Sequence, residues 1–220
     1  LMSCCISRKG RRMKITNIWL KGSWKEVLND CRFTVSKPPL DKEPSERFKK
    51  HILIAEHSPI RDIHIKFDII DLGTCFITHL VRHMWEPFVR SQRTDKTGVD
   101  RHSLPQDSPN DMRGDMNIQN AIDTSRKRLC FKSSTETREA WELFKYELHK
   151  VDPYIADVLV PNCVYRCGCP EEDPDADNDK CCNMCWTWLP LSYDGLVDIR
   201  ERYAPYNEWL YAKWKKKKGE

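Results

Sequence analysis

Three arginines and a histidine stand close together in the segment RHMWEPFVRSQR, residues 82–93, whose only acid is Glu86. The segment follows the apolar run TCFITHLV, so its charges begin where a buried element is expected to end. Arginine binds phosphate and carboxylate groups through paired hydrogen bonds and is costly to leave without a partner beside a hydrophobic core. Arg101 and Arg128 add two more cations at the edges of predicted elements. The set indicates either a pocket for a dianionic ligand, such as a nucleotide phosphate, or ordinary surface charge.

The glycine pattern restricts how such a phosphate would be held. The glycines form neither a GxxxxGK[ST] loop nor a GxGxxG turn, the motifs in which backbone amides cradle phosphate. Any phosphate must therefore be bound by side chains. The net charge of +4 is small for a nucleic-acid-binding protein, so a nucleic-acid partner is not expected. The four lysines at 215–218 are interpreted as a solvated tail.

Six of the eleven cysteines fall between residues 163 and 185. Cys182 and Cys185 have the spacing of metal ligands, and Cys167 and Cys169 form a tight pair around a glycine. Together these four thiolates would suit a zinc site, while an iron–sulfur cluster and a set of free thiols are the alternatives. Because a closed site of four sulfur ligands leaves no open coordination position, such a zinc site would be structural rather than catalytic.

Length and hydropathy favour a cytoplasmic protein of one domain with an appendage. The chain of 220 residues is long enough to bury a packed core. No apolar run reaches the ~18 residues of a membrane span, and no membrane partner is expected. The first twelve residues carry their charges after a short apolar patch, unlike a signal peptide, and are interpreted as an extension outside the fold. In a reducing compartment the cysteines should be thiols or metal ligands.

Hydrophobic periodicity predicts two strands and a larger number of helices. Residues 63–70 alternate like a half-buried strand, whose inward side chains would be Ile63, Ile65, Phe67 and Ile69. Residues 94–115 are polar, contain glycine and proline, and are predicted to be a loop. The other predicted elements are a strand at 13–20 and helices at 23–33, 42–57, 74–83, 116–131, 134–151, 153–159 and 195–218. Few, irregularly spaced strands favour an α+β fold.

Several segments, in the same order, resemble motifs of the flavin-dependent thymidylate synthases. The segment at 82–93 is similar to the family's R-H-R-x7-S-x-R motif. The other similar segments are HSPIRDIHIKFDII, DRHSLP, NIQNAIDTSRKRLC, TETRE and DPYIADVLVPNC. The resemblance implies a thymidylate synthase-complementing-protein-like domain at 13–162, with a mixed sheet and several helices. An extension at 1–12 would precede it, and a Cys-rich segment with an aromatic, basic C-terminal helix would follow at 163–220.

The substrate implied by the resemblance is a uracil deoxynucleotide, deoxyuridine monophosphate (dUMP). The residues carried over to its binding are His79, Arg82, Ser91, Gln92, Arg93, Arg101 and Arg128. Arg128 would be catalytic, because a cation near the uracil ring stabilises the negative charge that makes carbon 5 nucleophilic. The family's sites are built between subunits, so the resemblance also implies a homotetramer.

The resemblance further implies a flavin, FAD, with methylenetetrahydrofolate and NADPH as co-substrates. The residues carried over to the flavin are Ser58, Arg82, His83, Asn117, Gln119 and Asp123. Met84 stands where the family has a cation, Gln119 where it has arginine, and Asp123 where it has asparagine. We expect Arg90 to replace the missing cation and FAD to be bound more weakly than in the family.

Two function classes remain open from the sequence. The first is an enzyme that methylates dUMP to dTMP with flavin chemistry. The second is a degenerate relative that acts as a nucleotide- or nucleic-acid-binding module without that chemistry. The tryptophans and tyrosines of the C-terminal segment would stack on bases in the second case, although core packing is the commoner role of such side chains.

Overall fold

The sheet has four antiparallel strands, in a computed structural model that describes residues 13–169 and 198–220. The strands are β1 (Lys14–Lys21), β2 (His64–Gly73), β3 (Glu86–Val89) and β4 (Pro109–Asn117), and their spatial order is β1-β2-β4-β3. β2 and β4 lie in the centre and pair from His64 opposite Asn117 to Gly73 opposite Pro109. The α+β class predicted from the sequence is therefore confirmed for the described residues. The mixed sheet implied by the resemblance is wrong for them, because all described strand pairs are antiparallel.

Helices and short 3-10 turns connect and cover the strands. None of the described helices combines the length and the apolar character needed to cross a lipid bilayer. Their bounds are α1 (Trp24–Phe33), α2 (Glu46–Ile54), η1 (Ser58–Asp62), α3 (Thr74–Leu80), α4 (Thr94–Thr97), η2 (Arg101–Ser103), α5 (Ile118–Arg128), α6 (Thr135–Val151), α7 (Pro153–Asp157), α8 (Asn162–Arg166) and α9 (Ile199–Lys218).

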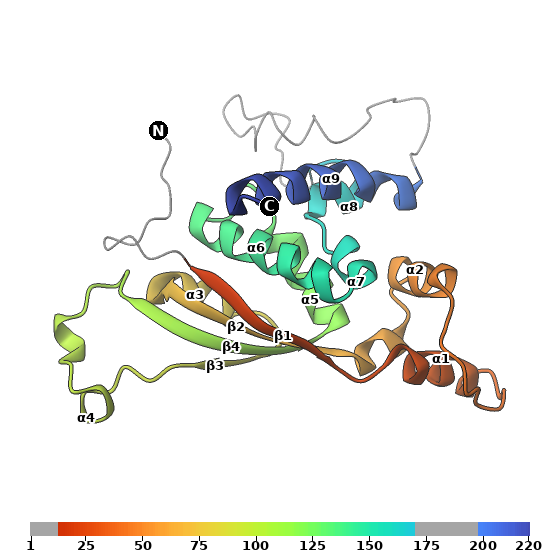
Figure 1. The fold of residues 1–220 in the computed structure, drawn as a ribbon, viewed down its shortest axis with the longest axis horizontal. Helices are drawn as coiled ribbons and strands as arrows, with labels where there is room; N and C mark the ends of the chain where they lie inside the picture. Colours follow the sequence, from red (N-terminus) through yellow and green to blue (C-terminus); the bar gives the residue numbers. More distant parts are fainter. Residues whose placement is uncertain (1–12, 170–197) are drawn as a thin grey trace.

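The core lies between one face of the sheet and α6. The predicted alternation along β2 is confirmed, since Ile63, Ile65, Phe67 and Ile69 are all buried. The ring of Phe67 lies 4.4 Å from that of Phe144 and 6.2 Å from that of Trp141, both on α6 (centroid distances). Figure 1 shows α5, α6 and α7 on this side of the strands, while the opposite face of the sheet carries the polar side chains of β2 and β4.

The loop predicted at 94–115 is wrong, because its second half is the central strand β4. The inward positions of β4 are Asn110, Met112, Gly114 and Met116, so only the two methionines give a hydrophobic signal. A Cβ atom on Gly114 would lie 2.4 Å from the Phe67 ring and 2.7 Å from the Trp85 ring. Aromatic rings from neighbouring elements therefore fill the space that side chains of β4 would normally occupy. The short edge strand β3 was likewise not predicted.

Most predicted helices are confirmed, with shifted ends. Ser23 caps α1 by accepting a hydrogen bond from the Glu26 backbone N–H, as expected for its position. α3 ends at Leu80, three residues earlier than predicted, so Arg82 and His83 lie in the segment between α3 and β3. The predicted stripe of α5 is buried along its length and comprises Ile118, Ala121, Ile122, Ser125 and Leu129.

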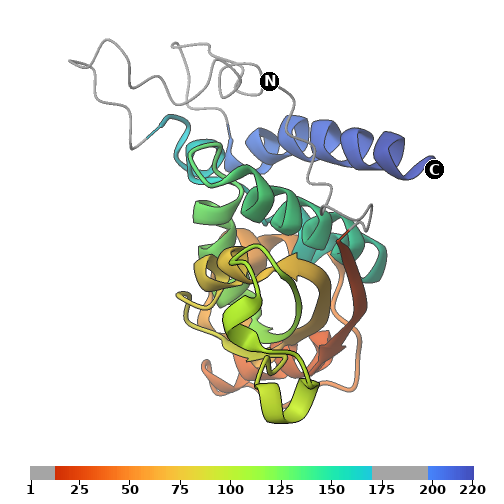
Figure 2. The same cartoon turned by 90° about the vertical axis from the view of Figure 1, so that its left-hand side faces the viewer.

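The C-terminal helix α9 packs on the side of α6 that faces away from the sheet, as Figures 1 and 2 both show. Tyr206, Leu210 and Trp214 are buried in the same hydrophobic cluster as α6, and so is Cys163 of α8. Core packing is therefore the observed role of these aromatic side chains. The core is continuous across the boundary predicted at residue 163, whereas most of the Cys-rich stretch and the N-terminal extension lie outside the described residues.

Candidate functional site

The last turn of α5 holds Arg128 in a fixed position relative to α6. The indole Nε1 of Trp141 donates a hydrogen bond of 2.8 Å to the hydroxyl of Ser125, which in turn donates to the Ala121 carbonyl at 2.7 Å. Ser125 and Trp141 are both fully buried. Leu129, the residue after Arg128, is buried as well. The helix therefore has little freedom to rotate, and the backbone position of Arg128 is fixed.

Arg128 meets the 82–93 segment through His83. Its Nε donates a hydrogen bond of 2.7 Å to His83 Nε2. Burial, and then the positive charge of Arg128, lower the pKa of His83 to about 4. Burial also lowers the pKa of Arg128, and the nearby charge of Arg82 lowers it further. Arg82 itself is exposed.

The guanidinium groups of Arg82 and Arg128 form a positive site. Among the residues that the structure describes, no carboxylate lies within ion-pair distance of Arg82 or Arg128. Most other described arginines that were candidates do have such a partner, for example Arg93 with Asp95 at 2.8 Å. Two neighbouring cations that lack a carboxylate favour binding of an anion, which would remove their mutual repulsion. The arrangement suits a phosphate or the negatively polarised edge of a ring.

Two further arginines predicted to bind substrate belong to a separate excursion of the chain. Arg93 and Arg101 belong to the excursion that carries α4 and η2, which Figure 1 shows extending away from the sheet. Arg93 makes a bidentate pair with Asp95, and the Arg101 backbone N–H donates to the Thr94 hydroxyl. Their convergence with Arg82 and Arg128 stays a prediction that this single chain does not display.

Three further residues predicted to bind substrate are described, and two of them make hydrogen bonds within the chain. Ser91 accepts a hydrogen bond from the Arg93 backbone N–H at 3.2 Å. The amide of Gln92 donates to the hydroxyl of Thr74, at the start of α3, at 3.1 Å. His79 lies half-buried in the last turn of α3, three residues before Arg82. Of the three, His79 is nearest in sequence to the Arg82–His83 pair.

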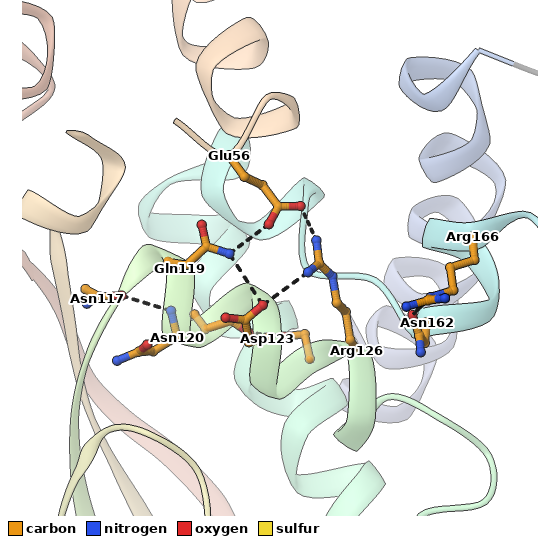
Figure 3. A network of polar contacts seen from close by, with 10 residues as sticks. Glu56, Asn117, Gln119, Asn120, Asp123, Arg126, Asn162 and Arg166 are labelled. Carbon is orange, nitrogen blue, oxygen red and sulfur yellow. Dashed lines mark hydrogen bonds and ion pairs between the residues drawn. The ribbon is translucent and has the colours of Figure 1, made fainter. Parts of the chain in front are cut away.

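The residues predicted to face a flavin on α5 form a closed polar network, drawn in Figure 3. The amide of Gln119 donates to Glu56 at 2.7 Å and to Asp123 at 3.4 Å. Arg126 pairs with Asp123 at 3.1 Å and also with Glu56. The guanidinium carbon of Arg126 lies 3.8 Å from the centre of the Tyr165 ring on α8. The network therefore joins α5 to the end of α2 and to α8.

Sequence reasoning missed Glu56 and Arg126. The spacing of Asp123 and Arg126 at i and i+3 on a predicted helix favours an ion pair and was an available signal. The contact between Arg126 and Glu56 spans 70 positions, and no sequence pattern indicated it. Asn117, also predicted to face the flavin, caps α5 by accepting from the Asn120 backbone N–H at 2.9 Å. Ser58 is exposed at the start of η1.

A flavin dinucleotide does not fit this network as it stands. FAD carries a negatively charged diphosphate, which needs cations or free hydrogen-bond donors. Arg126 is already paired with two carboxylates, and the donor of Gln119 is shared between the same two groups. Arg90, expected to supply a cation, pairs with Asp111 at 3.0 Å. It lies on the face of the sheet opposite to α6, beside Arg113.

The cysteines predicted to hold zinc are only partly described. Cys167 and Cys169 are half-buried free thiols just after α8, and Cys167 adopts a left-handed backbone conformation with φ of 56°. Cys182 and Cys185 lie outside the described residues. Within the ranges 13–169 and 198–220, no group of three or more potential ligands is arranged to hold a metal ion. The zinc site therefore stays a prediction.

Comparison with known proteins gives the fold. No protein-family model matches the chain, and no curated protein matches it. A solved structure of the UMP/dUMP methylase PolB from Streptomyces cacaoi, bound with 5-Br dUMP, is similar with a TM-score of 0.55 at 12% identity. The match covers 67% of this chain and 94% of that chain. A structure of the same methylase bound with 5-Br UMP has a TM-score of 0.49 at 14% identity and the same coverage. The chain thus has a fold similar to that of a UMP/dUMP methylase.

Proposed function

We propose that the chain binds a uracil nucleotide between the end of α5 and the segment 81–85, and that it is an enzyme of the methylation type. The observation that carries the proposal is the pair of cations Arg82 and Arg128, which has no carboxylate partner among the described residues. The fold, similar to that of a methylase solved with a bromouracil nucleotide, supports the same substrate class. So does the family resemblance, which assigned Arg82 and Arg128 to the nucleotide.

The chemistry of this site follows from the donors that Arg128 retains. Its Nε is bonded to His83, which leaves its two terminal amino groups for a ligand. A guanidinium beside a uracil ring stabilises negative charge on the ring oxygens and nitrogen, and this raises the nucleophilicity of carbon 5. Arg82, which is exposed, is placed to attract the phosphate of the same nucleotide. We assign no nucleophile of the protein to the reaction.

The family resemblance would supply the methyl group from methylenetetrahydrofolate and the electrons from NADPH through FAD. We retain these three ligands as part of the proposal, to be tested by binding. No residue of the α5 network is assigned to them, because its charges are already paired. A homotetramer, in which Arg93 and Arg101 of one subunit would approach another subunit's site, is proposed on the same resemblance.

The α5 network also favours a second candidate function. Asp123 stands at a position that the resemblance assigns to the flavin, and Glu56 joins the same network. A chain that binds the nucleotide but has these acids there would be a nucleotide-binding module without flavin chemistry. Two like charges near an anionic cofactor oppose its binding unless cations offset them. The two candidates share the nucleotide site and differ in the flavin.

Calorimetric titration with dUMP and with UMP tests the proposal. Charge-assisted hydrogen bonds contribute about 1.5–3 kcal/mol each, so Arg128→Ala and Arg82→Ala should each weaken binding by about tenfold or more. Arg47→Ala, which removes an exposed arginine of α2, is the matched control and should leave the affinity unchanged. Equal affinities in all four proteins would refute the site.

Addition of FAD to the dUMP-saturated protein separates the two candidates. Saturable binding of FAD, with formation of dTMP on addition of methylenetetrahydrofolate and NADPH, supports the enzyme. Tight dUMP binding without any bound FAD identifies the binding module.

A further inference from the structure

We propose that His83 is a positioning residue, which orients the guanidinium of Arg128 toward the nucleotide instead of contacting a flavin. The inference rests on the proposed function and assigns a new role within its site. It starts from the 2.7 Å contact between Arg128 Nε and His83 Nε2. Arginine always carries its proton, so His83 Nε2 must be the acceptor, and the imidazole is neutral with its own proton on Nδ1.

This hydrogen bond fixes the plane of the guanidinium group. The group is planar, and its five N–H bonds point in set directions. When Nε–H is held by the imidazole, one N–H bond of the terminal amino groups runs parallel to it beside His83, and the other three are aimed away from His83. No described residue accepts a hydrogen bond from these amino groups. Arg128 therefore presents a pre-oriented fork of donors, the geometry that recognises a carbonyl edge or a phosphate.

Both partners of the contact are anchored in the same aromatic cluster. The Trp85 backbone N–H donates to the His83 carbonyl at 2.9 Å, and the Trp85 ring is buried against Phe67. Arg128 is anchored through its helix, because Ser125 is hydrogen-bonded to Trp141. The rings of Trp85 and Trp141 lie 6.4 Å apart. The separation of His83 and Arg128 is thus set by packed rings, which resist displacement.

The electrostatic environment keeps His83 in the state that this role requires. Burial of the imidazole disfavours its charged form first, and the positive charge of Arg128 on α5 disfavours it further. The low pKa of His83 agrees with this arrangement. A histidine that accepts from Arg128 at Nε2 has no second acceptor to offer, so it is poorly suited to receive a hydrogen bond from a cofactor.

A double-mutant cycle with dUMP as the probe tests the role. His83→Leu removes the acceptor and should weaken dUMP binding about tenfold. His83→Gln, whose carbonyl oxygen can accept from Arg128 Nε, should stay within about threefold of the native affinity. In the Arg128→Ala background, His83→Leu should cause no further loss. An additive loss in that background, or a His83→Gln variant as weak as His83→Leu, would overturn the inference. Thermal melts of each variant exclude unfolding as the cause.

Nitrogen NMR of the ligand-free protein keeps this test separate from that of the proposed function. The imidazole of His83 should be the neutral Nδ1–H tautomer at neutral pH, and its pKa should rise in Arg128→Ala because a neighbouring cation is removed. An Nε2–H tautomer in the native protein, or a pKa that is the same in both proteins, would refute the positioning role whether or not dUMP binds. If the native protein fails to bind dUMP while the NMR result holds, the contact stands and the nucleotide assignment falls.

Discussion

Lys145 provides a prediction that depends on the core alone. This residue of α6 is completely buried, and its Nζ donates a hydrogen bond to the Ala156 carbonyl on α7. The amine lies 5.2 Å from the centre of the Tyr211 ring and 5.8 Å from that of Tyr206. Burial lowers the pKa of Lys145 from its usual 10.5 to about 7, and the charge of Asp157 partly opposes the shift.

The sign of the pH effect follows from this depressed pKa. Between pH 7 and pH 10.5 the unfolded chain binds a proton at Lys145 that the folded chain has released, so the free energy of unfolding rises with pH across this window. At 1.36 kcal/mol per pKa unit, the lysine lowers stability at pH 7 by about 4 kcal/mol relative to high pH. About 2 kcal/mol of that is recovered by about pH 9.

We therefore expect Lys145→Met to be more stable than the native protein at pH 7. The loss of a donor to the Ala156 carbonyl opposes the gain by about 1–3 kcal/mol, which is less than the burial penalty. The advantage of the variant should shrink by about 2 kcal/mol between pH 7 and about pH 9. Urea denaturation of both proteins at the two pH values measures it, with Lys96→Met at an exposed lysine as the control. An advantage that is the same at both pH values would refute the reasoning.

Three further predictions follow from other parts of the chain. Gly114→Ala should lower the free energy of unfolding by about 1–3 kcal/mol or more, because its Cβ would overlap the rings of Phe67 and Trp85. The control is Gly168→Ala, whose Cβ would have no atom within 4 Å. Equal denaturation midpoints of the two variants would contradict the packing around Gly114. Combined Glu56→Gln and Asp123→Asn should free Arg126 and raise the affinity for FAD, measured by flavin absorbance; an unchanged affinity would show that the network does not oppose the cofactor. Native mass spectrometry should find one zinc that Cys182→Ser releases, and a folded protein purified metal-free would argue against that site.

Periodic segments of the fold were predictable from the sequence, and the central strand β4 was not. β2 and α5 bury side chains at regular intervals, so their residues alone define the inward face. β4 has Asn110 and Gly114 at inward positions, and its environment is supplied by Phe67 and Trp85 from other elements. The burial of such a strand cannot be recognised from its own residues, because it depends on side chains of neighbouring elements.

The sequence allowed the residues of the candidate site to be selected, but it did not predict which of them contact one another. Arg82, His83 and Arg128 were selected from motif spacing, yet the hydrogen bond between His83 and Arg128 joins residues 45 positions apart. The same limit applies to Glu56, whose partners on α5 are more than 60 positions away. Sequence patterns describe the spacing of residues within one element, whereas these contacts depend on how α5 packs against α6 and the end of α2.

The central claim is that a uracil nucleotide binds at Arg82 and Arg128. A crystal structure of the protein with 5-bromo-dUMP measures this most directly, because the anomalous scattering of bromine marks carbon 5 of the uracil ring. We expect a bromine peak beside the guanidinium of Arg128, with the phosphate near Arg82 and the hydrogen bond between His83 and Arg128 intact. A bromine peak in another part of the molecule, such as the groove beside Arg90 and Arg113, or no peak in crystals soaked to saturation, would contradict it.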